Sequence, residues 1–314
     1  MYRHLLVPVD GTDASIELVG NAVGLAQAVG ARITFLHAGV ERGGARAAEL
    51  LAKAEAASHA SGVPCSSSRA TRGSPGAAIA EAARSHGCDL IVVAQPAPPV
   101  APAAMPPLPD GLFGVGLPVL WSSPTAGPGA HAIGVLRDEH RSLGAVLHAW
   151  IDALASARAA DRAADPAAMR PFVRYLQLFA DELHHPKEAR YLFRRLRMRT
   201  DRVSAELDEL ERQHMRDREL LADLARLVDG LAAAGTVEAK RELEAGVQRY
   251  AAFQWEHMGR EEGVVLPAAQ RHLTPADWSA VDAGFAGVRE RGGVDERELE
   301  RLFALIVGTV ARPD

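Results

Sequence analysis

The chain has 314 residues, of which 48% are hydrophobic and 24% charged, and its formal net charge is -5. This composition excludes a largely disordered chain, and the charge balance lacks the basic excess of a nucleic-acid-binding protein. The length predicts two domains, since single cores seldom grow beyond about 250 residues. Because the sequence shows neither a membrane-spanning apolar run nor a secretory signal, we expect a cytoplasmic protein without membrane contact.

The first 93 residues or so alternate short apolar runs with helical stretches. The apolar runs are typical of buried parallel strands and cover residues 5–9, 32–37, 63–69 and 89–93. The helical stretches between them cover residues 14–29 and 45–60 and a segment that opens at Ser74-Pro75. This alternation predicts an α/β fold with a parallel sheet, to which residues 117–121 would add a fifth strand.

The pattern changes after the fourth strand. Seven prolines lie between residues 96 and 109, a density that no helix tolerates, and residues 122–129 are typical of a linker. From residue 131 onward nearly every stretch is helical in pattern. We therefore predict four parts: an α/β domain at 1–124, a linker at 125–130, a helical domain at 131–272 and a helical extension at 273–314.

Four of the 12 histidines suggest a metal site in the helical part. They are His140, His184, His214 and His257, and two of them have a glutamate four residues later, Glu188 and Glu261. A spacing of four puts both side chains on one helix face, one turn apart. Imidazole and carboxylate together suit a divalent transition metal.

The spacing of these positions predicts an up-down four-helix bundle. In such a bundle, ligands at one height lie equally far from the turn that joins their helices. The midpoints fall near residues 162, 200 and 236–237, and signals for a helix break occur at 161–166, Thr200-Asp201 and Gly235-Thr236. All six side chains would then lie at one level.

Four of the six side chains belong to apolar stripes on the first, third and fourth helices, which predicts that the histidines and glutamates are buried. The stripes are Leu136, His140, Leu143, Leu147, Trp150; then Val203, Leu207, Leu210, His214, Leu221, Leu224; then Val247, Tyr250, Gln254, His257, Glu261, Val264, Ala268. Two buried carboxylates need a positive partner. Arginine could supply the charge, but four converging imidazoles would then have no role, so we favour a metal.

The remaining histidines of this part have weaker signals. A histidine on an apolar face can be a hydrogen-bonded core residue, and we expect His148 and His272 to be structural or on the surface. His185 adjoins a predicted ligand. The sequence leaves open whether it binds metal, supports a ligand or is structural.

Four segments of the helical part carry a family resemblance. They are Asp138-Glu139-His140, His184-His185-Pro186-Lys187-Glu188, His214, and His257-Met258 with Glu261-Glu262. Residues 131–272 resemble a hemerythrin-type HHE cation-binding domain. The resemblance implies two iron ions with an oxo or hydroxo bridge, imidazole ligands at His140, His184, His214 and His257, and bridging carboxylates at Glu188 and Glu261.

The chain departs from the oxygen-carrying members of that family. Those members use a spacing of five on the last helix, so Glu262 competes with Glu261 as a ligand. They also have a second histidine four residues after the third-helix ligand, where this chain has Arg218. One iron would then have fewer imidazoles, an exchangeable position or a substitute ligand. This favours a sensor or reactive centre over simple oxygen storage.

The first domain is similar to the universal stress protein family, on the basis of residues 6–15, 73–75, 89–93 and 118–120. The resemblance implies a five-stranded parallel sheet and a homodimer formed through this domain. Asp10 stands where the family contacts adenine.

Nucleotide-binding members of that family hold ATP phosphates on a glycine loop after the fourth strand. Residues 94–99 of this chain are rich in proline there, and proline has no N–H to donate. We therefore do not expect ATP to bind, and we expect Gly111, Gly114 and Gly116 to be turn glycines.

Together these features predict a di-iron stress-response protein that binds or senses O₂, NO or redox state. A binding or sensing role is favoured over catalysis. One alternative is a di-iron enzyme that handles NO, peroxide or O₂, or releases iron for repair. Another is an ATP-binding signalling module with a metal-loaded bundle. A purely structural zinc site is disfavoured, because such sites are usually four-coordinate and rich in thiolates.

Overall fold

The structure is a computed structural model, and it describes residues 2–39, 45–71, 73–95, 112, 116–123, 127–160, 165–291 and 296–310. The chain divides into two compact units, Met1–Ala126 and Gly127–Asp314. The proline-rich segment and part of the predicted linker lie outside the described residues. Among the helices described, none has the length and apolar character needed to cross a membrane.

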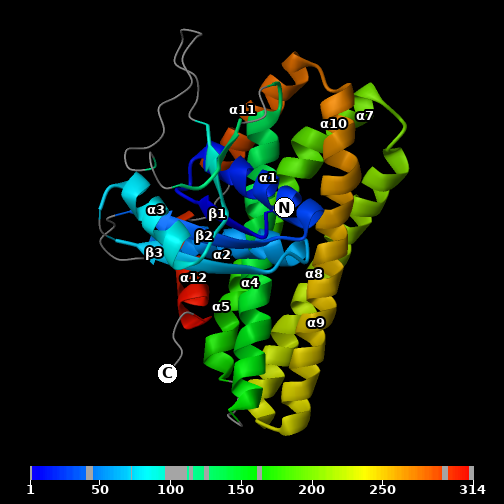
Figure 1. Cartoon of the computed structure of the whole chain (residues 1–314). Coiled ribbons are helices and arrows are strands. Elements are labelled where there is room, and N and C mark those ends of the chain that lie inside the picture. The colour runs from blue at the N-terminus through cyan, green and yellow to red at the C-terminus, as the bar shows by residue number, and fades with distance from the viewer. Residues whose placement is uncertain are drawn as a thin grey trace. The chain divides into compact units, whose positions relative to one another are not determined.

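The first unit is a parallel sheet with helical crossovers (Figure 1). Its elements are β1 (His4–Pro8), α1 (Asp13–Val29), β2 (Arg32–Ala38), α2 (Ala45–Ala60), β3 (Cys65–Ala70), α3 (Pro75–Ser85), β4 (Leu90–Ala94) and β5 (Val119–Ser122). The strand order is β3-β2-β1-β4-β5, and every neighbouring pair is parallel. The predicted five-stranded α/β fold is confirmed.

The alternation of side chains along β1 explains why the sheet is covered on both faces. Leu5 and Val7 join a core with residues of α1 and α2, whereas Leu6 joins a second core with residues of α3. Successive residues of a strand point to opposite faces, so a strand buried on both faces is apolar throughout. This is why β1 appears in the sequence as an uninterrupted apolar run.

The second unit is helical. Its elements are α4 (Ala130–Ala159), α5 (Pro166–Leu178), η1 (Phe179–His184), α6 (His185–Lys187), η2 (Glu188–Phe193), α7 (Arg194–Arg199), α8 (Ser204–Ala234), α9 (Val237–Arg260), η3 (Glu261–Val265), α10 (Leu266–His272), α11 (Pro275–Arg291) and α12 (Glu296–Val310). Breaks near residues 200 and 236 occur as predicted. The expected turn near residue 162 lies outside the described residues.

The long helices of this unit pack side by side (Figure 1). Helix α8 contacts α9 and α5, and α4 also contacts α9 and α5. The last two helices pack onto this group: α12 contacts α4 and α5, while α11 contacts α4, α6 and η2. The predicted extension is therefore part of the packed helical unit.

Three π-helical segments, η1, η2 and η3, interrupt the regular helices. A π-helical turn holds more residues than an α-helical turn and so shifts which side chains face inward. The last predicted stripe is wrong at Val264 for this reason. Val264 is 40% exposed, and the next residue, Val265, is fully buried in its place.

Candidate metal centre

The six predicted ligands lie on six different elements of the helical unit. His140 lies on α4, His184 ends η1, Glu188 begins η2, His214 lies on α8, His257 on α9, and Glu261 begins η3. Their exposed fractions range from 1% for the two glutamates to 8% for His214. The predicted burial of all six side chains is confirmed.

The donor atoms of these six side chains form two overlapping groups. One consists of His140, His184, Glu188 and Glu261, the other of Glu188, His214, His257 and Glu261. Within each group, the ligand atoms lie within 4.8 Å of one another. Both carboxylates belong to both groups, so the arrangement suits two metal ions that share two carboxylates.

Each glutamate directs one oxygen to each group. Oε2 of Glu261 lies 3.0 Å from Nε2 of His140, and Oε1 lies 3.3 Å from Nε2 of His257. Oε1 of Glu188 lies 3.4 Å from Nε2 of His184, and Oε2 lies 3.3 Å from Nε2 of His214. A bridging carboxylate requires this orientation of its two oxygens.

Most of these inward atoms are buried without a hydrogen bond. Within the described residues, this holds for Nε2 of all four histidines, Oε2 of Glu188 and both oxygens of Glu261. A buried polar atom without a partner costs about 1–3 kcal/mol. Metal ions would give these donor atoms partners, so the residues present fit a metal pair of the imidazole and carboxylate kind.

The outer nitrogens of three histidines are hydrogen-bonded across helices. The Nδ1 atom of His184 lies 2.9 Å from Glu139, that of His257 lies 2.9 Å from Gln213, and that of His140 lies 2.8 Å from Glu262. Such contacts set the tautomer and the ring orientation of a metal-binding histidine. The geometry therefore favours Glu261 as the ligand and Glu262 as the residue that orients His140.

The sequence interpretation did not assign roles to Glu139, Gln213 or Lys187. Lys187 is fully buried and pairs with the carboxylate of Glu139. Each of these residues adjoins a predicted ligand in the sequence or lies within three residues of one. Proximity was thus the available signal, but it does not reveal which neighbouring helix a side chain reaches.

The buried charges perturb each other strongly. Burial lowers the pKa of His214 to about 3, whereas the adjacent carboxylates of Glu261 and Glu262 outweigh burial and raise the pKa of His140 to about 10. Burial and the neighbouring Glu261 hold the pKa of Glu188 well above its usual value. Burial opposes ionisation of Glu261, but His257 and His140 hold its pKa well below the ordinary range.

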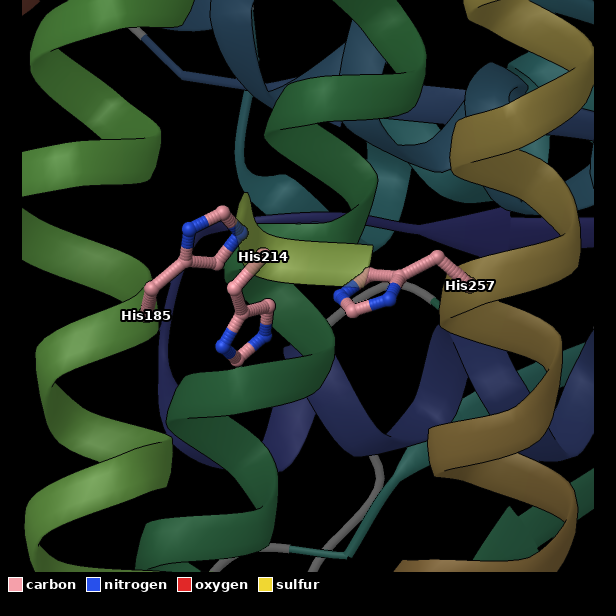
Figure 2. Close-up of side chains that lie close together, drawn as sticks. All are labelled: His185, His214 and His257. Carbon is pink, nitrogen blue, oxygen red and sulfur yellow. The ribbon is translucent and has the colours of Figure 1, made fainter. Parts of the chain in front are cut away.

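The other histidines divide as follows. His185 is buried, and its ring stacks on His214 with 3.8 Å between centroids (Figure 2). His148 is half-buried, with its ring 5.3 Å from that of Trp255, and His272 is half-buried on α10. Arg218 is 61% exposed and pairs with Asp181, so this position does not supply an interior side chain.

The predicted nucleotide position lies at the end of β1. Asp10 is exposed, and its Oδ1 accepts hydrogen bonds from the backbone N–H and the hydroxyl of Thr12. Gly116 has a φ of 73°, which suits the expected turn glycine. Gly111 and Gly114 lie outside the described residues, as does most of the proline-rich stretch that replaces the phosphate loop.

The chain thus consists of an α/β unit followed by a helical unit whose buried histidines and glutamates are arranged as in a metal-binding protein. Residues 131–269 match the hemerythrin HHE cation binding domain, and residues 1–97 match the universal stress protein family. The chain therefore combines a universal stress protein domain with a hemerythrin HHE domain. The match of the second domain supports metal binding, with iron as the typical metal, and the match of the first supports a role in the stress response.

Solved universal stress proteins resemble the first part of the chain. One from Burkholderia pseudomallei is 19% identical and covers 38% of this chain and 96% of its own, with a TM-score of 0.31. A universal stress protein in complex with cAMP is 25% identical and covers 39% of this chain and 97% of its own, with a TM-score of 0.32. One from Archaeoglobus fulgidus is 19% identical and covers 38% of this chain and 98% of its own, with a TM-score of 0.33. No curated protein matches the chain.

Proposed function

We propose that the helical unit is a four-helix bundle that holds two iron ions, and that the protein binds or senses O₂ or NO in a stress response. His140 and His184 would hold one ion, and His214 and His257 the other. Glu188 and Glu261 would bridge them. The observation that carries this proposal is the convergence of buried donor atoms without hydrogen bonds, in two groups that share both carboxylates.

An iron pair, when bound, supplies reversible binding of small gaseous ligands and a change of redox state. The chain's own residues prepare the surroundings. Phe179, Phe193 and Phe253 lie with their rings 5.3 to 6.3 Å from those of His184, His214 and His257, where they help to exclude water. Glu139, Gln213 and Glu262 keep three imidazoles oriented with one nitrogen inward.

The proposal is tested by purifying the protein without oxygen, counting iron and recording visible spectra before and after adding O₂ or NO. We expect two iron ions per chain and a spectrum that changes with at least one of the gases. Less than one iron per chain, or zinc alone, would contradict the proposal. Two iron ions per chain with spectra that neither gas changes would contradict the binding or sensing of gases but would still support the two-iron site.

A second candidate, a di-iron enzyme, is favoured by one buried network. Gln254 donates hydrogen bonds to Asp217 at 2.6 Å and to Tyr250 at 2.8 Å, and both residues are buried. Asp217 lies three residues after His214, and Gln254 lies three residues before His257. Reduction of NO or peroxide consumes protons. Burial raises the pKa of Asp217 to about 7 and the pKa of Tyr250 well above its usual value, so both groups can hold a proton inside this unit near neutral pH. Measured turnover of NO or peroxide would select this candidate over a sensor.

A further inference from the structure

His185 has an unusual position, because it and the preceding His184 are both buried. In a regular α-helix, adjacent side chains point about 100° apart, so one of the two would normally turn away from the interior. Here the π-helical segments η1 and η2 flank the short helix α6 that begins at His185. Such local widening is frequent at functional sites, and it brings two successive imidazoles inward.

The ring of His185 lies beside the predicted metal centre. Its Nδ1 atom is buried and makes no hydrogen bond within the described residues. His185, His214 and His257 form a third group, whose ligand atoms lie within 4.8 Å of one another. Figure 2 shows the three side chains, with the ring of His185 beside that of His214. The centroids of the His185 and His257 rings are 5.9 Å apart.

His185 differs from the other residues that adjoin a ligand. Glu139, Gln213 and Glu262 each share a hydrogen bond with the outer nitrogen of a histidine on another helix. His185 instead stacks on His214, with 17° between the ring planes. A stacked ring cannot orient its neighbour through a hydrogen bond. Nδ1 of His185 has no hydrogen-bond partner within the described residues, so no such bond competes with a metal for this ring.

Helix α8 supplies only one imidazole to the centre. The position four residues after His214 is Arg218, whose side chain is exposed and lies 2.6 Å from Asp181. A metal next to His214 would therefore have no second ligand from α8 at that position. His185, however, belongs to the same donor group as His214 and His257.

We infer that a ring nitrogen of His185 is a direct ligand of the metal ion held by His214 and His257, so that α6 supplies the imidazole that α8 lacks. This inference rests on the proposed two-metal site. That ion has three imidazoles and two shared carboxylates, whereas the ion at His140 and His184 has two imidazoles and the same carboxylates. The two metal positions are thus unequal in their protein ligands.

The inference is tested with metal-free, full-length protein titrated with Co²⁺, whose visible absorption reports the number and type of ligands. His185→Phe keeps an aromatic ring against His214 but removes the donor nitrogen. His185→Ala removes both the ring and the donor. His148→Ala is the matched control, because His148 also contacts an aromatic ring but belongs to none of the donor groups.

We expect the wild type and His148→Ala to bind two Co²⁺ per chain. Both His185 variants should lose affinity for one Co²⁺ by more than about 100-fold, beyond the usual effect of a supporting residue. Added imidazole should restore the absorption band of that Co²⁺ ion in His185→Ala. Glu188→Ala, which lacks a shared carboxylate, should weaken both ions. Wild-type affinity and absorption in His185→Phe would overturn the inference.

A measurement on the wild type keeps the test independent of how the variants fold. In the Co²⁺ protein, the ring N–H proton of each coordinated histidine has a strongly shifted NMR signal. Five such signals support coordination by His185, whereas four overturn it with the two-metal site intact. Fewer than two Co²⁺ bound to the wild type would instead contradict the proposed function.

Discussion

Asp217 illustrates how a single buried residue sets a pH dependence. Burial and the nearby Asp181 raise its pKa to about 7, although hydrogen bonds from Tyr250 and Gln254 oppose the shift. In the unfolded chain, an aspartate has a pKa of about 3.9. Between these values the folded state binds more protons, so the contribution of Asp217 to stability is full at low pH and is lost as pH rises towards 7.

We expect Asp217→Asn to remove the loss of folding stability that ionisation of Asp217 causes. Relative to the wild type, the variant should gain stability as pH rises from about 4 to about 7, and the difference should stay constant above that range. Urea unfolding of the metal-free protein at pH 5 and pH 8 measures it. Asp223→Asn, an exposed aspartate on the same helix, is the control and should leave the pH slope unchanged. Equal slopes in the wild type and Asp217→Asn would contradict the expectation.

At the level of elements, the close approach of α11 to η2 depends on a glycine. A Cβ atom added to Gly284 would lie 2.2 Å from the ring of Tyr191. Only the lack of a side chain lets the two segments pack at this separation. Because Tyr191 belongs to the segment that begins with Glu188, this packing also supports the metal centre from outside.

Gly284→Ala should therefore destabilise the protein by about 1–3 kcal/mol, the usual cost of overpacking. Gly230→Ala on α8 is a matched control, since the added Cβ would meet nothing within 4 Å. That control should gain about 0.5–1 kcal/mol from better helix propensity. Denaturant unfolding compares the two variants. A neutral Gly284→Ala would show that Tyr191 can move aside without cost.

At the scale of the whole molecule, the two units should differ in which ligand stabilises them. A metal that binds only the folded state stabilises it by about 2.7 kcal/mol at about 100 times its Kd. We expect anaerobic Fe²⁺ to raise the melting temperature and ATP to leave it unchanged, because proline occupies the expected phosphate loop. Scanning calorimetry with each ligand measures both effects. A rise with ATP would contradict the expected loss of nucleotide binding.

The edge of the sheet is one place where the predicted homodimer could form. β5 ends the strand order, and its Leu120 is 43% exposed. Edge strands with exposed apolar side chains tend to pair with another chain. If the predicted homodimer forms there, Leu120→Lys should give a monomer in light scattering, whereas Met215→Lys, an exposed residue of α8, should remain dimeric. A dimer that survives Leu120→Lys would exclude this edge.

The sequence was sufficient for the features that depend on local periodicity. Apolar runs such as residues 5–9 and 89–93 identify the buried strands, because a strand covered on both faces is apolar throughout. The spacing of four between His184 and Glu188, and between His257 and Glu261, indicates shared helix faces. With the break signals, it also led to the residues whose donor atoms converge in the structure.

Tertiary structure decided what depends on contacts between helices. The proposed choice of Glu261 over Glu262 as a ligand rests on the hydrogen bond between Glu262 and His140, which joins two helices. The inward positions of His185 and Val265 depend on π-helical turns, which the residue spacing does not reveal. A periodic pattern fixes which side chains share a face only while the helix stays regular. Where a turn widens, packing against neighbouring helices decides which residues reach the centre.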